Sequence, residues 1–340
     1  MFHPQRILFE TGTLEFPMGK QIYDLFSKKE DVELIQCSPN KVKELITLDS
    51  TSATYQSGKR TLVLSKKKRS AFQTCKPSAD YMLPLVSGCM GQCEYCYLHT
   101  KLGDKPFVRV HVNIDDILDR AKEYITASPD KITSFEGSAT SDPVCVEPFT
   151  HSLATAIDFF AKEPQGRFRF VTKYDDVDSL LHLQHNNKTE IRFSINTEHI
   201  RSSYEHYTTT VKARILAAQK VMDAGYPTGF LIAPVFLYDG WREEYFELIQ
   251  NLRQTLPANP PHPVTFEVIT HRFTPKAKEL IGEIFPNSTL PMNEDERVYK
   301  RGQFGYGKFT YAKDDMRNVK EFFKQELGSA FPNGNINYIV

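Results

Sequence analysis

Short apolar or β-branched runs alternate with segments of helical periodicity through the central part of the chain. Most segments between the runs carry apolar residues at the spacing of an amphipathic helix. The helix expected over 113–127, for example, places Ile114, Ile117 and Leu118 on one face, with Asn113 as its N-cap. This alternation predicts βα units around a parallel sheet. The expected strands are YMLPLV (81–86), KITSF (131–135), RFRFVT (167–172), EIRFSI (190–195), GFLIAPVF (229–236) and VTFEVI (264–269).

Six βα units can form either an open doubly wound sheet or an incomplete barrel, and the pattern does not separate the two. In both α/β folds the catalytic and binding residues are expected at the C-terminal ends of the strands. Residues 1–76 are expected to form a small α/β segment packed on the central fold. Residues 77–290 hold the six units, and 291–340 a glycine-punctuated β-hairpin followed by a closing helix.

Composition narrows the class of protein. The 340 residues are 40% hydrophobic and 25% charged, as in soluble globular proteins, and the net charge is zero. Binding to nucleic acid therefore needs local clusters of Lys and Arg. No stretch approaches the roughly 18 apolar residues of a membrane span, and the N-terminus lacks a secretory pattern. We expect a cytoplasmic protein without a membrane partner, whose six cysteines are thiols or metal ligands.

Three of these cysteines form a tight cluster directly after the first expected strand. Cys89, Cys93 and Cys96 follow the spacing C-x3-C-x2-C, and Gly88 and Gly91 allow a short loop to fold around a bound group. Three ligands are one fewer than a closed four-coordinate site needs. The spacing favours a [4Fe–4S] cluster with one iron open to a non-protein ligand.

Two other interpretations of the cluster remain open. The three cysteines could bind zinc together with His99, although structural zinc sites usually draw ligands from two separated knuckles. They could also cluster by chance, without a metal. Cys37, Cys75 and Cys145 stand alone and are expected to be structural filler or plain core thiols.

The cysteine loop, with Tyr95 before its last cysteine, resembles the signature of the radical S-adenosylmethionine superfamily. This resemblance implies a partial (βα)6 TIM-like barrel, in agreement with the apolar runs. It also implies that the open iron chelates S-adenosylmethionine. An electron from an unidentified one-electron reductant then splits this cofactor into methionine and a 5′-deoxyadenosyl radical.

Five longer stretches carry a more specific resemblance: GCMGQCEYCYLHT (88–100), FEGSATSD (135–142), RFVTKY (169–174), RFSIN (192–196) and GFLIAPVF (229–236). Together they resemble the spore photoproduct lyase family within that superfamily, and the likeness covers nearly the whole chain. The resemblance implies a carbon–carbon lyase that repairs double-stranded DNA containing the thymine–thymine spore photoproduct. It implies that the radical takes the C6 hydrogen, the methylene bridge breaks, and the remaining thymine radical regains a hydrogen atom. The alternatives are a different radical enzyme acting on nucleic acid and a zinc-dependent nucleic-acid-binding protein.

The family resemblance also implies roles for single residues. The family's hydrogen-donor cysteine corresponds to Ala139, and two tyrosines proposed to relay the hydrogen match Tyr95 and Tyr97. Alanine has no S–H group, so we expect cofactor cleavage to survive and clean return to thymines to be impaired. A deliberate Cys→Ala change or a natural variant with another donor would explain this residue. The cofactor contacts implied are Tyr95, Ser141, Lys173, Ser194 and the Ala233 backbone.

A lesion inside a duplex must be extruded to reach a cluster at the mouth of a barrel. Residues 297–313 carry five Lys or Arg, no acidic residue and interleaved aromatics, which suits phosphate contact and base wedging. We expect Arg301, Tyr306 and Lys308 to contact DNA. The alternative is a hairpin whose aromatics face the core, and the basic run 66–69 is a weaker DNA candidate.

Overall fold

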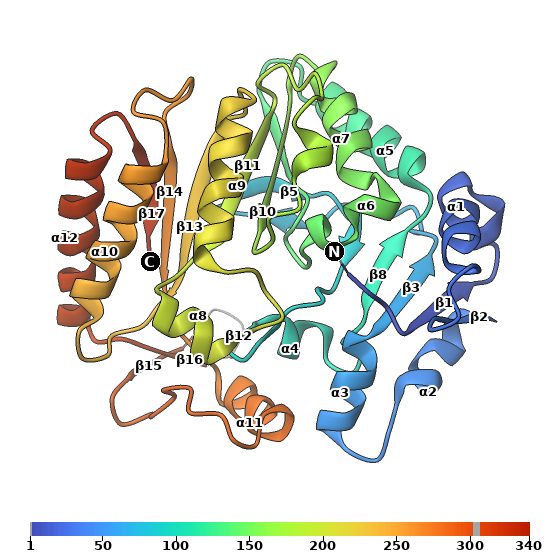
Figure 1. Cartoon of the computed structure of the whole chain (residues 1–340), viewed down its shortest axis with the longest axis horizontal. Coiled ribbons are helices and arrows are strands. Elements are labelled where there is room, and N and C mark those ends of the chain that lie inside the picture. Colours follow the sequence, from blue (N-terminus) through green and yellow to red (C-terminus); the bar gives the residue numbers. More distant parts are fainter. Residues whose placement is uncertain (1, 302–306) are drawn as a thin grey trace. The chain divides into compact units, whose positions relative to one another are not determined.

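The computed structural model describes residues 2–301 and 307–340 (Figure 1). The chain forms two compact units. The first consists of Met1–Gln92, Lys101–Thr172 and Asp176–Glu190, and the second of Cys93–Thr100, Lys173–Asp175 and Ile191–Val340. Among the described residues, no helix combines the length and the apolar character that crossing a membrane requires.

The first unit contains a five-stranded sheet in the order β2-β1-β3-β8-β6. Strands β2, β1, β3 and β8 are parallel, and β6 pairs antiparallel with β8. Every residue of β3 is buried, as expected for a central strand of a parallel sheet. The elements are β1 (Arg6–Glu10), α1 (Pro17–Phe26), β2 (Glu33–Cys37), α2 (Val42–Ile46), α3 (Thr51–Lys59), β3 (Thr61–Ser65), β6 (Val86–Ser87), β8 (Val108–His111) and α5 (Ile114–Thr126).

The same unit contains a second run of strands, in the order β4-β5-β9-β10. Strands β5, β9 and β10 are parallel, and the short β4 lies antiparallel at the edge. Phe160 and Phe168 stack in the core with ring centroids 5.3 Å apart. The elements are β4 (Thr74–Cys75), β5 (Ala79–Met82), β9 (Thr133–Glu136), α6 (Glu147–Thr150), α7 (Ser152–Ala161) and β10 (Gly166–Thr172).

The second unit is built on parallel strands in the order β11-β13-β14-β17. Helices α9, α10 and α12 run alongside these strands, and a β15–β16 hairpin precedes α12 (Figure 1). The elements are β11 (Thr189–Ile195), α8 (Glu198–Tyr204), α9 (Val211–Asp223), β13 (Thr228–Val235), α10 (Trp241–Thr255), β14 (Thr265–Thr270), α11 (Pro275–Ile284), β15 (Val298–Arg301), β16 (Gly307–Thr310), α12 (Lys313–Ala330) and β17 (Asn335–Ile339).

The α/β fold class predicted from the sequence is confirmed. Each of the six apolar runs overlaps a strand, namely β5, β9, β10, β11, β13 and β14, and helices separate most of them. The overlap is smallest for the first run, which shares only Tyr81 and Met82 with β5. These strands pair in parallel within each unit, as βα units of a partial barrel require. The expected C-terminal hairpin and closing helix are also present.

A buried carboxyl in the first unit makes its stability depend on pH. Glu147 is fully buried, and its carboxylate accepts hydrogen bonds from the backbone N–H groups of Leu153 (2.7 Å) and Ala154 (2.9 Å) at the start of α7. Burial raises the pKa of Glu147 to about 7 in spite of these bonds. The folded protein therefore holds a proton here that the unfolded chain releases above its ordinary pKa of 4.5.

Replacing Glu147 by glutamine should remove this pH dependence. In the unmodified protein the contribution of Glu147 is most favourable below pH 4.5 and falls by up to about 3 kcal/mol as the pH rises through 7. The difference in free energy of unfolding between Glu147→Gln and the unmodified protein should therefore shift in favour of the variant between pH 5 and pH 8. Urea unfolding at both pH values measures it, and a constant difference would contradict the assignment.

Candidate active site

The cysteine loop begins at a position that only glycine can occupy. Gly88 has φ +78°, and a Cβ there would lie 2.1 Å from the carbonyl oxygen of Phe107. Its N–H donates to the carbonyl of Thr140 at 2.8 Å, and Gly88 forms an isolated bridge with Ser141. The backbone just before Cys89 is thereby held against the segment that contains Ala139 and Ser141.

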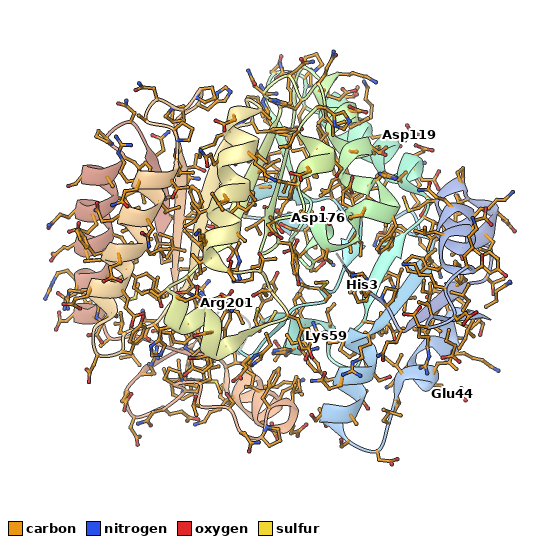
Figure 2. The ribbon with its side chains drawn as sticks, viewed as in Figure 1. His3, Glu44, Lys59, Asp119, Asp176 and Arg201 are labelled. Atoms are coloured by element: carbon orange, nitrogen blue, oxygen red, sulfur yellow. The ribbon has the colours of Figure 1, made fainter. Side chains whose placement is uncertain are left out.

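A buried lysine supports the same loop. Lys59, the last residue of α3 (Figure 2), donates from Nζ to the carbonyl oxygens of Cys89 (2.6 Å) and Gly91 (2.8 Å). The N–H of Gly91 also donates to Cys89 Sγ at 3.3 Å. A positive charge and a backbone donor beside Cys89 both favour its thiolate form. The sequence analysis did not identify Lys59, because nothing in the local pattern distinguishes it from other lysines at helix ends.

The remaining part of the loop is a hydrogen-bonded turn in the second unit. The N–H of Cys96 donates to the carbonyl of Cys93 at 3.1 Å, and the N–H of His99 donates to the carbonyl of Cys96 at 3.2 Å. His99 Nε2 lies 2.9 Å from the same Cys93 carbonyl, so this nitrogen is the ring donor and stabilises the turn. Within the described ranges, no group of three His, Cys, Asp or Glu side chains surrounds a single ion position.

The donor set fits an iron–sulfur cluster. Cys89, Cys93 and Cys96 are in no disulfide, and they come from one short loop held by backbone and lysine hydrogen bonds. Soft thiolate ligands in a sulfur-only set suit iron–sulfur clusters better than hard ions.

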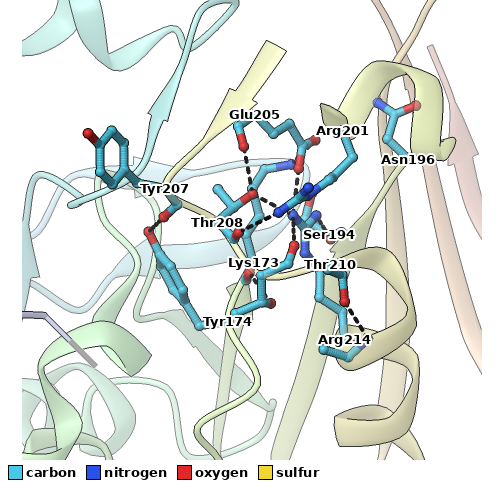
Figure 3. A network of polar contacts seen from close by, with 12 residues as sticks. Lys173, Tyr174, Ser194, Asn196, Arg201, Glu205, Tyr207, Thr208, Thr210 and Arg214 are labelled. Carbon is cyan, nitrogen blue, oxygen red and sulfur yellow. Dashed lines mark hydrogen bonds and ion pairs between the residues drawn. The ribbon is translucent and has the colours of Figure 1, made fainter. Parts of the chain in front are cut away.

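A buried polar network in the second unit centres on Glu205 (Figure 3). The Glu205 carboxylate is completely buried and accepts from Lys173 Nζ (2.7 Å), from Arg214 Nη2 (2.7 Å) and from the Tyr95 hydroxyl. Arg214 also donates from Nη1 to the carbonyl oxygen of Ser194 at 2.9 Å. Three residues expected to contact the cofactor, Tyr95, Lys173 and Ser194, are thus brought together.

The charges in this network are strongly coupled. Burial alone would raise the pKa of Glu205, but Lys173 and Arg214 lower it to about 2, so the carboxylate stays ionised. Burial and the Glu205 charge raise the pKa of Tyr95 well above its usual value, so the phenol stays neutral and can donate. Lys173 and Arg214 both face the Glu205 carboxylate. Of the two cations, Lys173 is the accessible one, with 18% of its side chain exposed and that of Arg214 fully buried.

Glu205 and Arg214 were missed by the sequence analysis. The sequence could have indicated Arg214, because this residue lies between Val211 and Ala218 on the buried face of α9, where an arginine needs a partner. Nothing in the sequence indicated Glu205.

A second carboxylate links two segments of the first unit. Glu136, at the end of β9, accepts from Ser78 Oγ at 2.7 Å and from Ser138 Oγ at 2.6 Å. Ser78 follows Cys75 by three residues, and Ser138 precedes Ala139. Glu136 therefore ties the β4–β5 turn, which directly follows Cys75, to the loop that contains Ala139.

Other residues expected at the site lie on separate elements. Ser141 is buried and donates to the Gly137 carbonyl at 3.4 Å. Tyr97 follows the last cysteine and is 57% exposed, and Ala233 lies on β13 before a cis peptide bond to Pro234.

The described part of the hairpin combines packed aromatic side chains with exposed or half-buried basic ones. Phe309 packs against Phe273 and Tyr299, with ring centroids 5.2 and 5.1 Å away. Arg301 is exposed, and Lys308 pairs across the hairpin with Lys300. Partial burial, Arg272 and Lys300 lower the pKa of Lys308, which indicates a cluster of like charges. Tyr306, the third expected DNA contact, lies outside the described residues.

Comparisons with known proteins agree over the whole chain. The family model described as spore photoproduct lyase matches residues 2–340. The chain is 46% identical to the spore photoproduct lyase of Clostridium acetobutylicum over 336 residues, covering 99% of this chain and 98% of the relative. It is 40% identical to that of Bacillus subtilis over 339 residues, covering 100% and 99%.

Solved structures of spore photoproduct lyase are also similar. One is complexed with dinucleoside spore photoproduct and has a TM-score of 0.96 at 39% identity. Another, with a TM-score of 0.96 at 40% identity, is a variant with bound AdoMet and dinucleoside spore photoproduct. In this variant one cysteine is replaced by alanine and one serine by cysteine. Each comparison covers 100% of this chain and 99% of the other.

Proposed function

Because this chain belongs to the spore photoproduct lyase family of radical S-adenosylmethionine lyases, we propose that it repairs double-stranded DNA by reversing the thymine–thymine spore photoproduct. Solved relatives bind AdoMet and the dinucleoside form of this lesion, which supports the same cofactor and substrate here. The proposed substrate is intracellular, so the protein would act in the cytoplasm and receive electrons from a reductant there.

The observation that carries the proposal is the network around Glu205. Lys173 is the partly exposed cation of this network, which suits the carboxylate of S-adenosylmethionine. Glu205 pairs with the lysine and, together with burial, keeps Tyr95 neutral beside it, while Arg214 holds Glu205. These side chains bind and orient the cofactor, and Ser141, Ser194 and the Ala233 backbone are the further proposed contacts.

Cys89, Cys93 and Cys96 would hold the [4Fe–4S] cluster. When bound, this group supplies the electron that cleaves S-adenosylmethionine and yields the 5′-deoxyadenosyl radical, which takes the C6 hydrogen of the lesion. Lys59 holds the loop backbone in place for this ligand set.

The last step needs a hydrogen donor, which Ala139 cannot be. We propose Cys75 for this role. In the solved variant with both ligands, the introduced cysteine precedes the introduced alanine by 64 residues, and Cys75 precedes Ala139 by the same 64 residues. The Glu136 carboxylate joins the segments that contain these two positions. This pairing favours a natural variant with another donor over a deliberate Cys→Ala change.

The other two lone cysteines of the first unit are poorer candidates. Cys145 is fully buried, and its Sγ donates to the Asp142 carbonyl at 3.0 Å. Cys37 ends β2 of the five-stranded sheet, whereas Cys75 is half-buried beside β5. In the proposed step the S–H bond of Cys75 breaks, its hydrogen atom forms the C–H bond of the thymine, and a thiyl radical remains on Cys75. This thiyl must regain a hydrogen atom before the next turnover, and Tyr95 and Tyr97 remain the proposed relay.

The proposed function is tested with protein that is reconstituted with iron and sulfide under anaerobic conditions. With dithionite, S-adenosylmethionine and dinucleoside spore photoproduct, it should release 5′-deoxyadenosine and the repaired thymine dinucleoside, both measured by chromatography. Cleavage of the cofactor without consumption of the lesion would indicate a different radical enzyme. A colourless protein with one bound zinc would instead support the nucleic-acid-binding alternative.

We expect the hairpin to contact the phosphates of lesion-containing duplex DNA through Arg301 and Lys308. Charge reversal at both (Arg301→Glu with Lys308→Glu) should weaken binding at least tenfold and reduce the slope of log K against log salt by about two. The matched control is Lys320→Glu with Lys324→Glu on exposed positions of α12, which makes the same change in net charge. Equal losses in both variants would show a general charge effect and leave the hairpin a structural element.

A further inference from the structure

A cavity of about 880 Å³ lies in the first unit against the five-stranded sheet. Its lining includes Glu10 and Thr11 at the carboxyl end of β1, residues 66–70 after β3, and Arg109 and His111 on β8, while α5 forms another wall. This volume is in the range of small-molecule sites. In the strand order β2-β1-β3, the two strands that follow β1 in the sequence lie on opposite sides of it. Open α/β sheets bind ligands at such a switch point, beyond the carboxyl ends of the strands.

The lining carries a surplus of positive charge. Eight Lys or Arg residues and four Asp or Glu residues contribute to it. The basic run 66–69 is part of this lining and not only a solvated turn. Its backbone is fixed, because the N–H of Lys67 donates to Asn113 Oδ1 at 2.8 Å and Asn113 Nδ2 donates back to the Lys67 carbonyl at 3.1 Å.

Lys67 is half-buried and lines the cavity together with His111. Burial, then Lys67 and Arg109, lower the pKa of His111 to about 3, so this ring is uncharged at neutral pH. Its Nδ1 lies 2.9 Å from Ser65 Oγ. A phosphate placed at Lys67 would meet a cation on a fixed backbone and a neutral neighbour.

A buried ion pair supplies polar groups that point to a ligand. Arg109 Nη2 lies 3.1 Å from Glu10 Oε1, and the Glu10 side chain is only 8% exposed. Glu10 Oε1 has this ion pair but no well-aligned hydrogen bond, and among the residues that the structure describes the buried Arg109 Nε has no hydrogen-bond partner. Buried polar atoms usually have hydrogen bonds, and the hydroxyl groups of a sugar would supply them.

We propose that this cavity binds a nucleoside phosphate. The phosphate would lie at Lys67 and Lys68, the sugar hydroxyls at Glu10 and Arg109, and the base against the half-buried Phe72. A concave lining with four carboxylates suits such a mixed small molecule better than the continuous phosphate backbone of a duplex, which the carboxylates repel. The site does not depend on the repair chemistry proposed above.

The test is equilibrium binding of ADP to the full-length protein, measured by calorimetry, with inorganic phosphate as a second probe. Lys67→Glu with Lys68→Glu should weaken ADP binding at least tenfold. Lys20→Glu with Lys28→Glu, on exposed positions at α1, makes the same change in net charge and should leave binding unchanged. Phe72→Ala should weaken the binding of ADP but not that of phosphate, because only ADP carries a base. Circular dichroism of each variant verifies folding.

Four results would overturn the proposal. The first is no ADP binding at millimolar concentration, and the second is equal losses in the two double variants. The third is ADP binding that survives Lys67→Glu with Lys68→Glu and is displaced by S-adenosylmethionine, which would assign ADP to the cofactor site. The fourth is normal ADP binding by Lys67→Glu with Lys68→Glu together with a loss of affinity for undamaged duplex DNA, which would make the basic run a DNA contact.

Discussion

Replacing Cys75 by alanine should reduce the yield of repaired thymine dinucleoside at least 100-fold, while 5′-deoxyadenosine formation stays within about twofold of the unmodified protein. The physical reason is that the thymine radical left after bridge cleavage needs a weak X–H bond, and the variant would have an alanine methyl group at both donor positions. A 100-fold loss corresponds to about 2.7 kcal/mol in the barrier of this step. The measurement is the ratio of the two products in one anaerobic reaction.

A rescue experiment separates this role from a structural one. Adding Ala139→Cys to the Cys75→Ala variant should restore repair, because it returns a thiol to the position where the family has its donor. Cys37→Ala is the matched control and should repair normally, since Cys37 lies on the five-stranded sheet. Normal repair by Cys75→Ala would make Cys75 the structural filler that its isolated position in the sequence indicated.

Replacing Glu205 by glutamine should destabilise the protein by about 3–5 kcal/mol, because the change leaves Lys173 and Arg214 as uncompensated charges in a buried network. It should also weaken S-adenosylmethionine binding at least tenfold, since Lys173 loses the carboxylate that orients it. Urea unfolding measures the first effect, and equilibrium dialysis of the folded, reconstituted variant measures the second.

The control for Glu205 is an exposed glutamate of the same unit. Glu198→Gln removes a carboxylate that lies 3.7 Å from Arg201 and is 62% exposed, so its effect on stability should stay below about 1 kcal/mol. If Glu205→Gln unfolds like this control and binds the cofactor normally, the network neither stabilises the unit nor positions Lys173.

The central strands of the fold were predictable because each contains a short run rich in apolar or β-branched residues. RFRFVT at 167–172, for instance, lies within β10 (Gly166–Thr172), and EIRFSI at 190–195 within β11. The order of strands was not predictable from periodicity, since the crossing from β2 to β3 depends on contacts between distant segments. The switch point beside β1 therefore became visible only in the structure.

The candidate site, like the fold, was predictable only where the signal is local in the sequence. The cysteine loop could be predicted because its three cysteines, the proposed ligands, lie within eight residues, and their spacing alone indicates a cluster site. Lys173 and Ser194 could be named only through the family resemblance, because a lysine or serine at a strand end is ordinary. Glu205 could not be identified from the sequence, because its partner Tyr95 is 110 residues away. The burial that makes their contact important cannot be read from the sequence around either residue.

Lys59, which holds the backbone of the cysteine loop, also bears on the reduction potential of a group bound there. Lys59 Nζ contacts two carbonyl oxygens of the loop, so a fixed positive charge lies next to the backbone that presents Cys89. Any redox group held by these thiolates gains an electron more easily beside that charge, and its midpoint potential moves in the positive direction. With the proposed cluster bound, the ammonium group would widen the range of cellular reductants that have enough driving force to start a turnover.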